Sequence, residues 1–225
     1  IVGAFAGDAL TDADFNVALG ILALTDETKG SKSVAVGYAS LGDSNFTTST
    51  DTFNTAVGYS SGRLITTGIE NTLVGAKAGD ALTDADFNVA LGYLSLSADT
   101  LGSQSTAIGY ATLAAQNFTT ATNAYNVAVG SQAGNDITTG TFNTLVGGLA
   151  GDAITTGTRN IAVGYNALGA DTLGSKSVAV GLGALADQNF TTATDALNTA
   201  VGHGAGTAVT TGFQNTYIGG LAGDA

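Results

Sequence analysis

The side chains that could do chemistry in this 225-residue chain are few, and most of them recur at regular intervals. His203 is the single histidine, and the chain contains no cysteine. In the sequence repeat, His203 holds the place that Tyr59 and Ser131 hold in earlier copies, which favours a surface substitution over a catalytic base. A catalytic site needs a unique set of groups with distinct roles, whereas a repeat supplies near-equivalent side chains. We therefore expect no catalytic residue and no enzymatic activity.

Two groups of aspartates could hold a cation, because carboxylate oxygens are preferred ligands of calcium. They are Asp8, Asp12 and Asp14, and Asp80, Asp84 and Asp86. The third copy of the same segment keeps Asp152 but continues with Ala, Ile and Thr, so the series is interrupted. The calcium-binding GGxGxD repeat is also missing from the sequence. We expect no metal site and no cofactor.

The charge of the chain excludes several classes of partner. The formal net charge is −12, with six lysines and arginines against 18 aspartates and glutamates. Nucleic acids and anionic membrane surfaces bind clustered positive charge, so neither is an expected partner. No apolar stretch is long enough to span a bilayer, so we expect no direct membrane insertion. The lack of cysteine is compatible with an oxidising, extracellular setting.

A short phrase that ends in glycine, such as NVALG at 16–20, organises the whole sequence. From Gly3 this anchor glycine returns at spacings of 17, 17, 21 and 17, and the same series repeats from Gly75 and from Gly147. The resulting super-repeats, each with a length of 72, cover 3–74, 75–146 and 147–218, and 219–225 begin a fourth. Fixed periods of this kind are typical of stacked, quasi-one-dimensional folds. Both ends fall at the same phase, so we interpret 1–225 as one repetitive segment of a longer chain.

Periods of 17 and 21 are too short for helical repeats and suit one coil of a β-solenoid. Before each anchor glycine the residues alternate as in a strand, for example Val17, Ala18 and Leu19. The sequence therefore predicts an all-β fold, a β-solenoid (β-roll) of about 13 stacked turns. A second strand is expected in most turns, for example over 64–67, with Gly68 closing it at a positive φ.

The positions around the anchor glycine predict a narrow interior. The residue three places after it is always small, and the next alternates in a fixed order between Gly and Leu. Four places before it stands Asn or Ser, for example Asn54 and Asn71. We expect these side chains to form a ladder that bonds to turn backbone and to copies in neighbouring coils.

Both faces of the predicted strand are apolar, which is typical of a strand buried on both sides. One face would fill the coil, and the other would meet another subunit through small residues that let backbones approach. We assign the second role to the residues two places before the anchor glycine. They include Ala56, Leu73, Ala128, Leu145, Ala200 and Tyr217. A cyclic homo-oligomer would bury such a stripe around its axis.

The longer coils, those of period 21, carry the only elaboration, a bulge of four extra residues once per super-repeat. Each bulge begins with an Asn-Phe pair: Asn45 and Phe46, Asn117 and Phe118, Asn189 and Phe190. An aromatic ring flanked by Asn and Thr suits contact with a sugar or protein receptor. The alternative, which we favour, is that the ring turns inward and seals the bulge.

The phrases SVAVGYAS (33–40), STAIGYAT (105–112) and SVAVGLGA (177–184) resemble the head repeats of trimeric autotransporter adhesins. The NTAVG and NTLVG style of 54–75 is similar to repeats in phage tail-fibre proteins. The resemblance covers essentially the whole chain. It implies a homotrimer of left-handed β-rolls, displayed on a cell or virion and used for attachment to a host-surface glycan or protein.

The resulting hypothesis is a structural and adhesive segment of an extracellular fibre, on a cell surface or a virion. Two alternatives stay open. One is a purely structural extracellular filament without a receptor. The other is an ice-binding solenoid, in which threonine ladders would order water.

Overall fold

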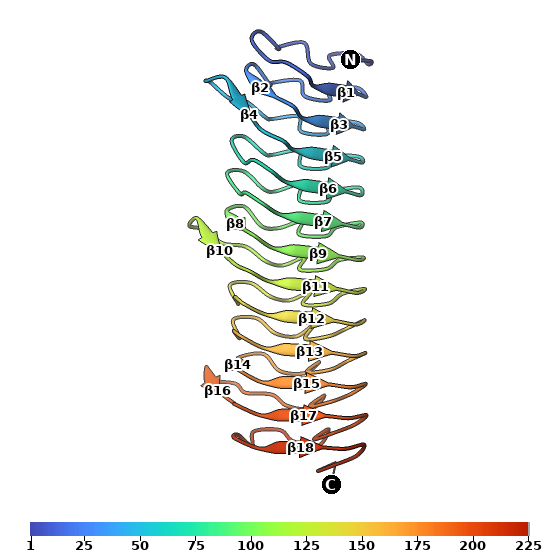
Figure 1. Cartoon of the computed structure of the whole chain (residues 1–225), viewed down its shortest axis with the longest axis vertical. Coiled ribbons are helices and arrows are strands. Elements are labelled where there is room, and N and C mark those ends of the chain that lie inside the picture. The colour runs from blue at the N-terminus through green and yellow to red at the C-terminus, as the bar shows by residue number, and fades with distance from the viewer. Residues whose placement is uncertain (225) are drawn as a thin grey trace. The chain divides into compact units, whose positions relative to one another are not determined.

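The computed structural model describes residues 1–224 and shows an all-β parallel solenoid of about twelve turns, without a helix in those residues. The chain divides into two compact units. Unit 1 comprises Ile1–Ser105 and Asn117–Asn123, and unit 2 comprises Thr106–Gln116 and the chain from Ala124 onward. Within each unit, successive coils lie one above the other and each contributes one strand to a parallel sheet (Figure 1).

The main sheet consists of three-residue strands that end directly before an anchor glycine. In unit 1 they are β1 (Val17–Leu19), β3 (Val34–Val36), β5 (Thr55–Val57), β6 (Thr72–Val74) and β7 (Val89–Leu91). In unit 2 they are β9 (Thr106–Ile108), β11 (Val127–Val129), β12 (Thr144–Val146), β13 (Ile161–Val163), β15 (Val178–Val180), β17 (Thr199–Val201) and β18 (Thr216–Ile218). Short side pairs are β2 (Gly30–Ser31) with β4 (Thr50–Asp51), β8 (Gly102–Ser103) with β10 (Thr122–Asn123), and β14 (Gly174–Ser175) with β16 (Thr194–Asp195).

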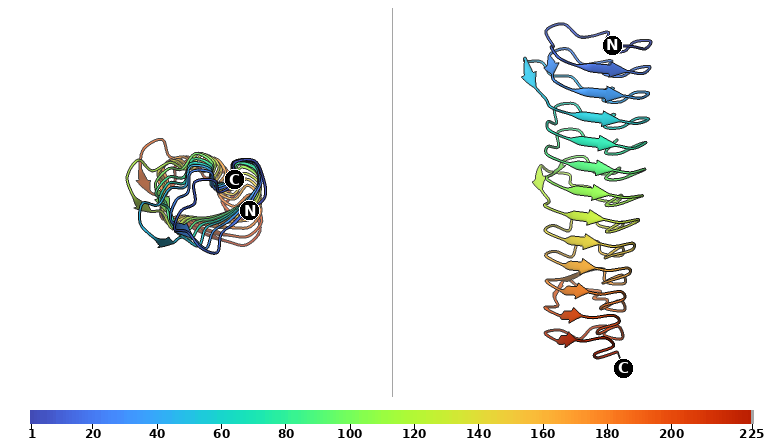
Figure 2. Two further views of the ribbon diagram at one scale, coloured as in Figure 1. Left: turned by 90° about the horizontal axis from the view of Figure 1, so that it is seen from above. Right: turned by 45° about the vertical axis from the view of Figure 1, so that its right-hand side comes forward.

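The register confirms the coil lengths read from the sequence. Val17 pairs with Val34 across a shorter coil, and Val34 pairs with Thr55 across a longer one. Equivalent residues of successive coils therefore form continuous rows, and in the view from above the coils of each unit overlap with a gradual offset from each to the next (Figure 2). Every side-chain property of a row is consequently a property of one side of the coil.

Close backbone approach explains the anchor glycine. Gly20 has a φ of 139°, and a Cβ there would lie 2.3 Å from the carbonyl oxygen of Gly37. Both the dihedral angle and the distance exclude an ordinary L side chain.

The prediction of a second strand over 64–67 is wrong. In 64–67, the amides of Thr66 and Thr67, followed by that of Gly68, all donate to the carbonyl oxygen of Thr83, at 2.9, 3.3 and 3.2 Å. A β-ladder needs a separate acceptor for each donor along the strand, so convergence on one carbonyl makes a bend. Gly68 does not have a positive φ. Glycine is needed there because a Cβ would lie 2.4 Å from the carbonyl oxygen of Ala85.

The interior of each coil is lined by the row two places before the anchor glycine, which corrects the assignment of the subunit interface. The five aliphatic residues of that assignment are 0% exposed within their own chain: Ala56, Leu73, Ala128, Leu145 and Ala200. Tyr217 is half-buried, with its ring beside Gly206. Because these side chains point inward, they cannot meet a second subunit.

Large and small residues alternate across this interior, as the Gly and Leu alternation predicts. The coil whose strand contributes Ala35 carries Leu41 four places after its anchor glycine, and both residues are fully buried. Where Leu73 enters from the strand, the facing position is Gly62, and a Cβ there would lie 2.7 Å from Leu73 Cδ1. The core is filled by complementary volumes rather than by any one residue type.

Candidate functional site

The bulges of the longer coils are the main departure from the regular coil, and Figure 1 shows β4, β10 and β16 standing apart from the main sheet. The rings of Phe46, Phe118 and Phe190 are only 6%, 5% and 6% exposed. The structure thus places these rings inside the bulge, in the sealing arrangement. They do not present a face to a receptor.

A buried carboxylate holds the bulge in unit 2. Asp171 is 0% exposed, and its Oδ1 accepts hydrogen bonds from the backbone N–H groups of Gly174 at 3.0 Å and Phe190 at 3.2 Å. Its Oδ2 accepts from the side-chain amide of Gln188 at 2.6 Å. Asp171 therefore ties the preceding coil to both the start of the bulge and its seal.

Unit 1 contains the same device twice. Glu27 Oε1 accepts from the N–H groups of Gly30 at 2.6 Å and Phe46 at 3.2 Å, and Oε2 accepts from the Ser44 hydroxyl at 2.6 Å. Asp99 Oδ1 accepts from Gly102 at 3.0 Å and Phe118 at 3.1 Å. The longer acid, Glu27, bonds to the short side chain of Ser44, whereas the shorter acid, Asp171, bonds to the longer side chain of Gln188. The combined length of the two side chains across the gap therefore stays similar.

Chemically, these carboxylates are structural acceptors, because each makes several charge-assisted hydrogen bonds in a buried setting. The sequence interpretation above did not identify them. A signal was present: Glu27, Asp99 and Asp171 stand seven places after an anchor glycine, where coils such as those of Ile65 and Leu82 carry a buried aliphatic residue. An acid in an otherwise apolar row indicates a specific buried partner.

The Asn residues of the bulges also bond to the preceding coil. Asn45, Asn117 and Asn189 each accept a hydrogen bond through Oδ1, from Thr28 at 3.2 Å, Thr100 at 3.1 Å and Thr172 at 3.1 Å. Asn45 and Asn117 remain exposed, and Asn189 is half-buried. Of the six bulge residues considered as receptor contacts, only these three have a side chain at the surface.

The Asn ladder is confirmed. The N–H of Asn71 donates to Oδ1 of Asn54 at 2.9 Å, and the side-chain amide of Asn54 donates to the carbonyl of Gly68 at 2.7 Å. Unit 2 repeats the pattern, with the N–H of Asn143 donating to Oδ1 of Asn126 at 2.9 Å. These side chains are buried and fully engaged, so they serve the backbone of the turn.

The outward side of the parallel sheet carries aliphatic side chains in both units. In unit 1, Val17 and Leu91 are 48% and 44% exposed, and in unit 2, Val146 and Ile161 are 36% and 42% exposed. These residues lie one or three places before an anchor glycine, the positions that we call the outer face. A parallel sheet normally has both faces covered. One chain leaves this face open.

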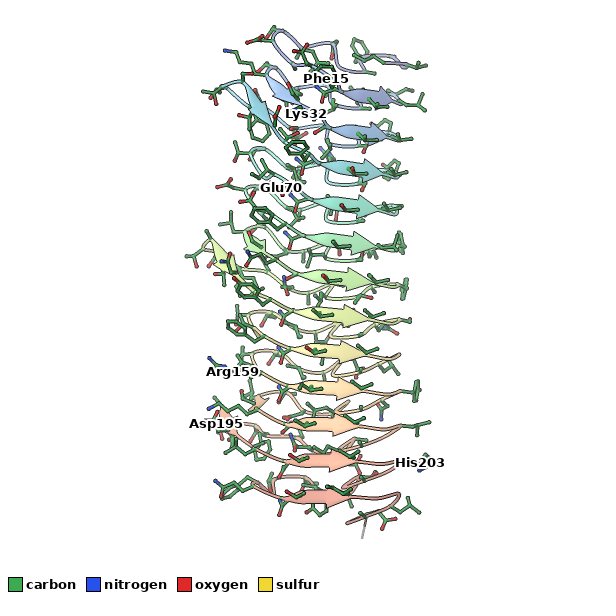
Figure 3. The ribbon with its side chains drawn as sticks, in the orientation of Figure 1. Phe15, Lys32, Glu70, Arg159, Asp195 and His203 are labelled. Carbon is green, nitrogen blue, oxygen red and sulfur yellow. The ribbon has the colours of Figure 1, made fainter. Side chains whose placement is uncertain are left out.

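Aromatic and basic side chains border the outer face at the row five places before the anchor glycine. In unit 1, Lys32 lies over the Phe53 ring at 5.2 Å and forms an ion pair with Asp51 at 2.6 Å. In unit 2, Tyr125 and Phe142 stack at 5.4 Å. Figure 3 shows Phe15, Lys32 and Glu70 along this edge in unit 1.

The remaining charged residues singled out in the sequence do not converge. Within residues 1–224, no group of three or more His, Cys, Asp or Glu side chains is placed to hold a metal ion. Burial raises the pKa of both Asp80 and Asp86 above the ordinary value of an aspartate. In unit 2, His203 projects on the opposite side of the coil from Arg159 and Asp195 (Figure 3).

Comparison with known proteins adds no relative to this picture: no protein-family model, curated protein or solved structure matches the chain. Among residues 1–224 there is also no helix of the length and apolar character needed to cross a membrane.

Proposed function

We propose that this chain is a structural and adhesive segment of a homotrimeric fibre, displayed outside a cell or on a virion, which attaches to a host cell or surface. The observation that carries the proposal is the uncovered outer face of the sheet in each unit, which consists of Val, Leu and Ile side chains together with threonines. Exposed apolar patches of this kind mark interaction surfaces. A second and third copy of the same chain would supply the same outer face, so that three such faces would meet around a common axis.

The trimeric state and left-handed coils come from the resemblance to adhesin head repeats, and the outer face supplies the surface that such a trimer needs. The stripe that meets the neighbouring subunits is then Val17, Leu91, Val146, Ile161 and their row mates, in place of the inward Ala and Leu row. The net charge of −12 would keep such fibres apart from one another and from nucleic acid.

The assembly is tested by the molar mass in solution. We expect three times the chain mass of 22.0 kDa in sedimentation equilibrium. Val146→Lys places a charge on the outer face and should give a monomer. Thr156→Lys, at an exposed site away from the outer face, should leave the mass unchanged. A wild-type monomer would contradict the proposed assembly.

Attachment is tested by adding the labelled trimer to host-type cells and to arrays of glycans and surface proteins. Binding that saturates supports adhesion, whereas a trimer that binds none of them is a structural filament. Thermal hysteresis of the same sample addresses ice binding. That alternative is weakened by Thr66, Thr83 and Thr138, whose hydroxyls donate to carbonyls of the next coil at 3.3, 3.0 and 3.2 Å.

A further inference from the structure

One cavity in unit 1 is lined by a set of side chains that the other super-repeats do not share. It has a volume of about 240 Å³ and lies where three successive coils leave the sheet. Its lining includes Tyr38, Tyr59, Asp43, Arg63 and Thr25. None of these residues belongs to the bulges or to the outer face.

Two tyrosines form an aromatic wall. The rings of Tyr38 and Tyr59 stack with centroids 5.3 Å apart and planes 11° from parallel. They are 45% and 54% exposed, although Ser60 beside them is buried. Stacking limits the freedom of both rings, so this apolar surface with polar hydroxyl tips is already in place before a ligand arrives.

A hydrogen-bond acceptor and a donor of opposite charge share the same cavity. Asp43 offers carboxylate oxygens and Arg63 a planar guanidinium with five N–H groups. Their coils are joined by the N–H of Asp43, which donates to the Arg63 carbonyl at 3.0 Å. Neither side chain belongs to an ion pair described in residues 1–224. The positive charge of Arg63 also acts on Asp80, where it partly offsets the burial that raises the pKa of that carboxyl.

The other super-repeats lack this combination. The positions of Tyr38, Tyr59 and Arg63 recur one super-repeat later as Tyr110, Ser131 and Asn135. In the super-repeat after that, they are Leu182, His203 and Thr207. Only the first copy therefore joins two rings to a guanidinium. The substitutions at the later copies show which side chains the coil accepts at these places.

We propose that this cavity binds a single neutral pyranose ring of a surface glycan. This inference rests on the proposed attachment function and names the class of ligand for it. Pockets for drug-sized ligands measure about 300–1,000 Å³, so this smaller cavity suits one ring. A pyranose has an apolar C–H face for Tyr38 and Tyr59. Its hydroxyl groups both donate and accept, which matches Asp43 and Arg63. An acidic sugar would meet the Asp43 carboxylate and the negative charge of the chain.

The test uses the full chain in its assembled form, with saturation-transfer NMR as the measure of binding. The probes are the methyl glycosides of glucose, galactose and mannose, and of glucuronic acid as the anionic comparison. We expect at least one neutral glycoside to bind. Tyr59→Ser and Arg63→Asn, which copy the residue types found at 131 and 135, should each weaken its affinity tenfold or more. Tyr165→Ser, at the same phase in unit 2, should leave it unchanged.

Three results would overturn the inference: no transfer to any neutral glycoside, unchanged affinity in both cavity variants, or tighter binding of the glucuronide. Circular dichroism and molar mass of each variant show that the fold and assembly persist. If the glycosides fail while the trimer still attaches to cells, only the cavity assignment falls. A monomer that attaches to nothing would remove the proposed function instead.

Discussion

Replacing Gly134 with alanine tests whether the interior is governed by complementary volume. Gly134 has a φ of 58°, and a Cβ there would lie 2.7 Å from Leu145 Cδ1. Leu113 occupies the same phase of the preceding coil with a φ of 49°. The backbone therefore accepts a side chain at this place. Crowding is what demands glycine, first by Leu145 and then by Leu113, whose Cδ2 would lie 2.9 Å from the added Cβ.

Gly183 provides the control. It has a φ of 65°, and a Cβ there would have no neighbour within 4 Å. Gly183→Ala should cost only the left-handed backbone term, about 1–2 kcal/mol. Gly134→Ala adds overpacking of about 1–3 kcal/mol. We therefore expect Gly134→Ala to lower the free energy of unfolding by about 1–3 kcal/mol more than Gly183→Ala does.

A double mutant separates crowding from backbone strain. Leu145→Ala alone should cost about 3–5 kcal/mol, because it empties a fully buried site. In that background Gly134→Ala loses its main clash and fills part of the cavity. The two changes should therefore be less harmful together than their sum, by about 1 kcal/mol or more.

The assay is urea unfolding followed by circular dichroism, at one protein concentration because subunit association shifts the midpoint. Variants are compared only where the m-value is unchanged. Hydrogen exchange of the Ile137 and Val146 amides reports the local effect. Equal losses for Gly134→Ala and Gly183→Ala, or strictly additive costs in the double mutant, would refute the volume argument.

Two further predictions concern aspartates of unit 2. Asp171→Ala should lower the free energy of unfolding by at least about 2 kcal/mol, because the donors of Gly174, Phe190 and Gln188 lose their acceptor. It should also open 189–194 to proteolysis, whereas the exposed control Asp187→Ala should do neither. Burial, with the nearby Asp136 charge, raises the pKa of Asp152, so the folded chain binds this proton more readily than the unfolded chain. The corresponding stabilisation is present at low pH and lost as pH rises through the raised pKa; Asp152→Asn should therefore raise the urea midpoint at about pH 7 but not at about pH 3. An equal effect at both pH values would contradict this account.

The candidate sites were only partly accessible from the sequence. The Asn-Phe pairs located the bulges, because four extra residues in a strict period must leave the regular coil. The ring orientation was not accessible, since Phe46 depends on the Glu27 carboxylate from the preceding coil, 19 residues away. The cavity at Tyr38 and Tyr59 depends on three coils meeting at one corner. The separate residues give no sign of a binding site in the sequence, because they form one only when the coils stack.

The sequence by itself determined the coil lengths, the parallel register and the all-β class. It could do so because a glycine that tolerates no side chain recurs at fixed spacing. When these glycines align from coil to coil, the strands directly before them can pair in only one register. The tertiary structure alone decided which strand face is inside. Both faces carry apolar residues, although the outer one also holds threonines such as Thr55 and Thr72, and alternation with a period of two is unchanged by reversing the faces.

That choice depends on side-chain volume. Leu73 fits inward only because Gly62 and Gly79 leave room for its side chain. The path of the turns brings these residues together, and local residue preference does not specify that path. Once the inward face is fixed, Val17, Val146 and Ile161 must point outward, and they form part of the surface on which the proposed assembly depends.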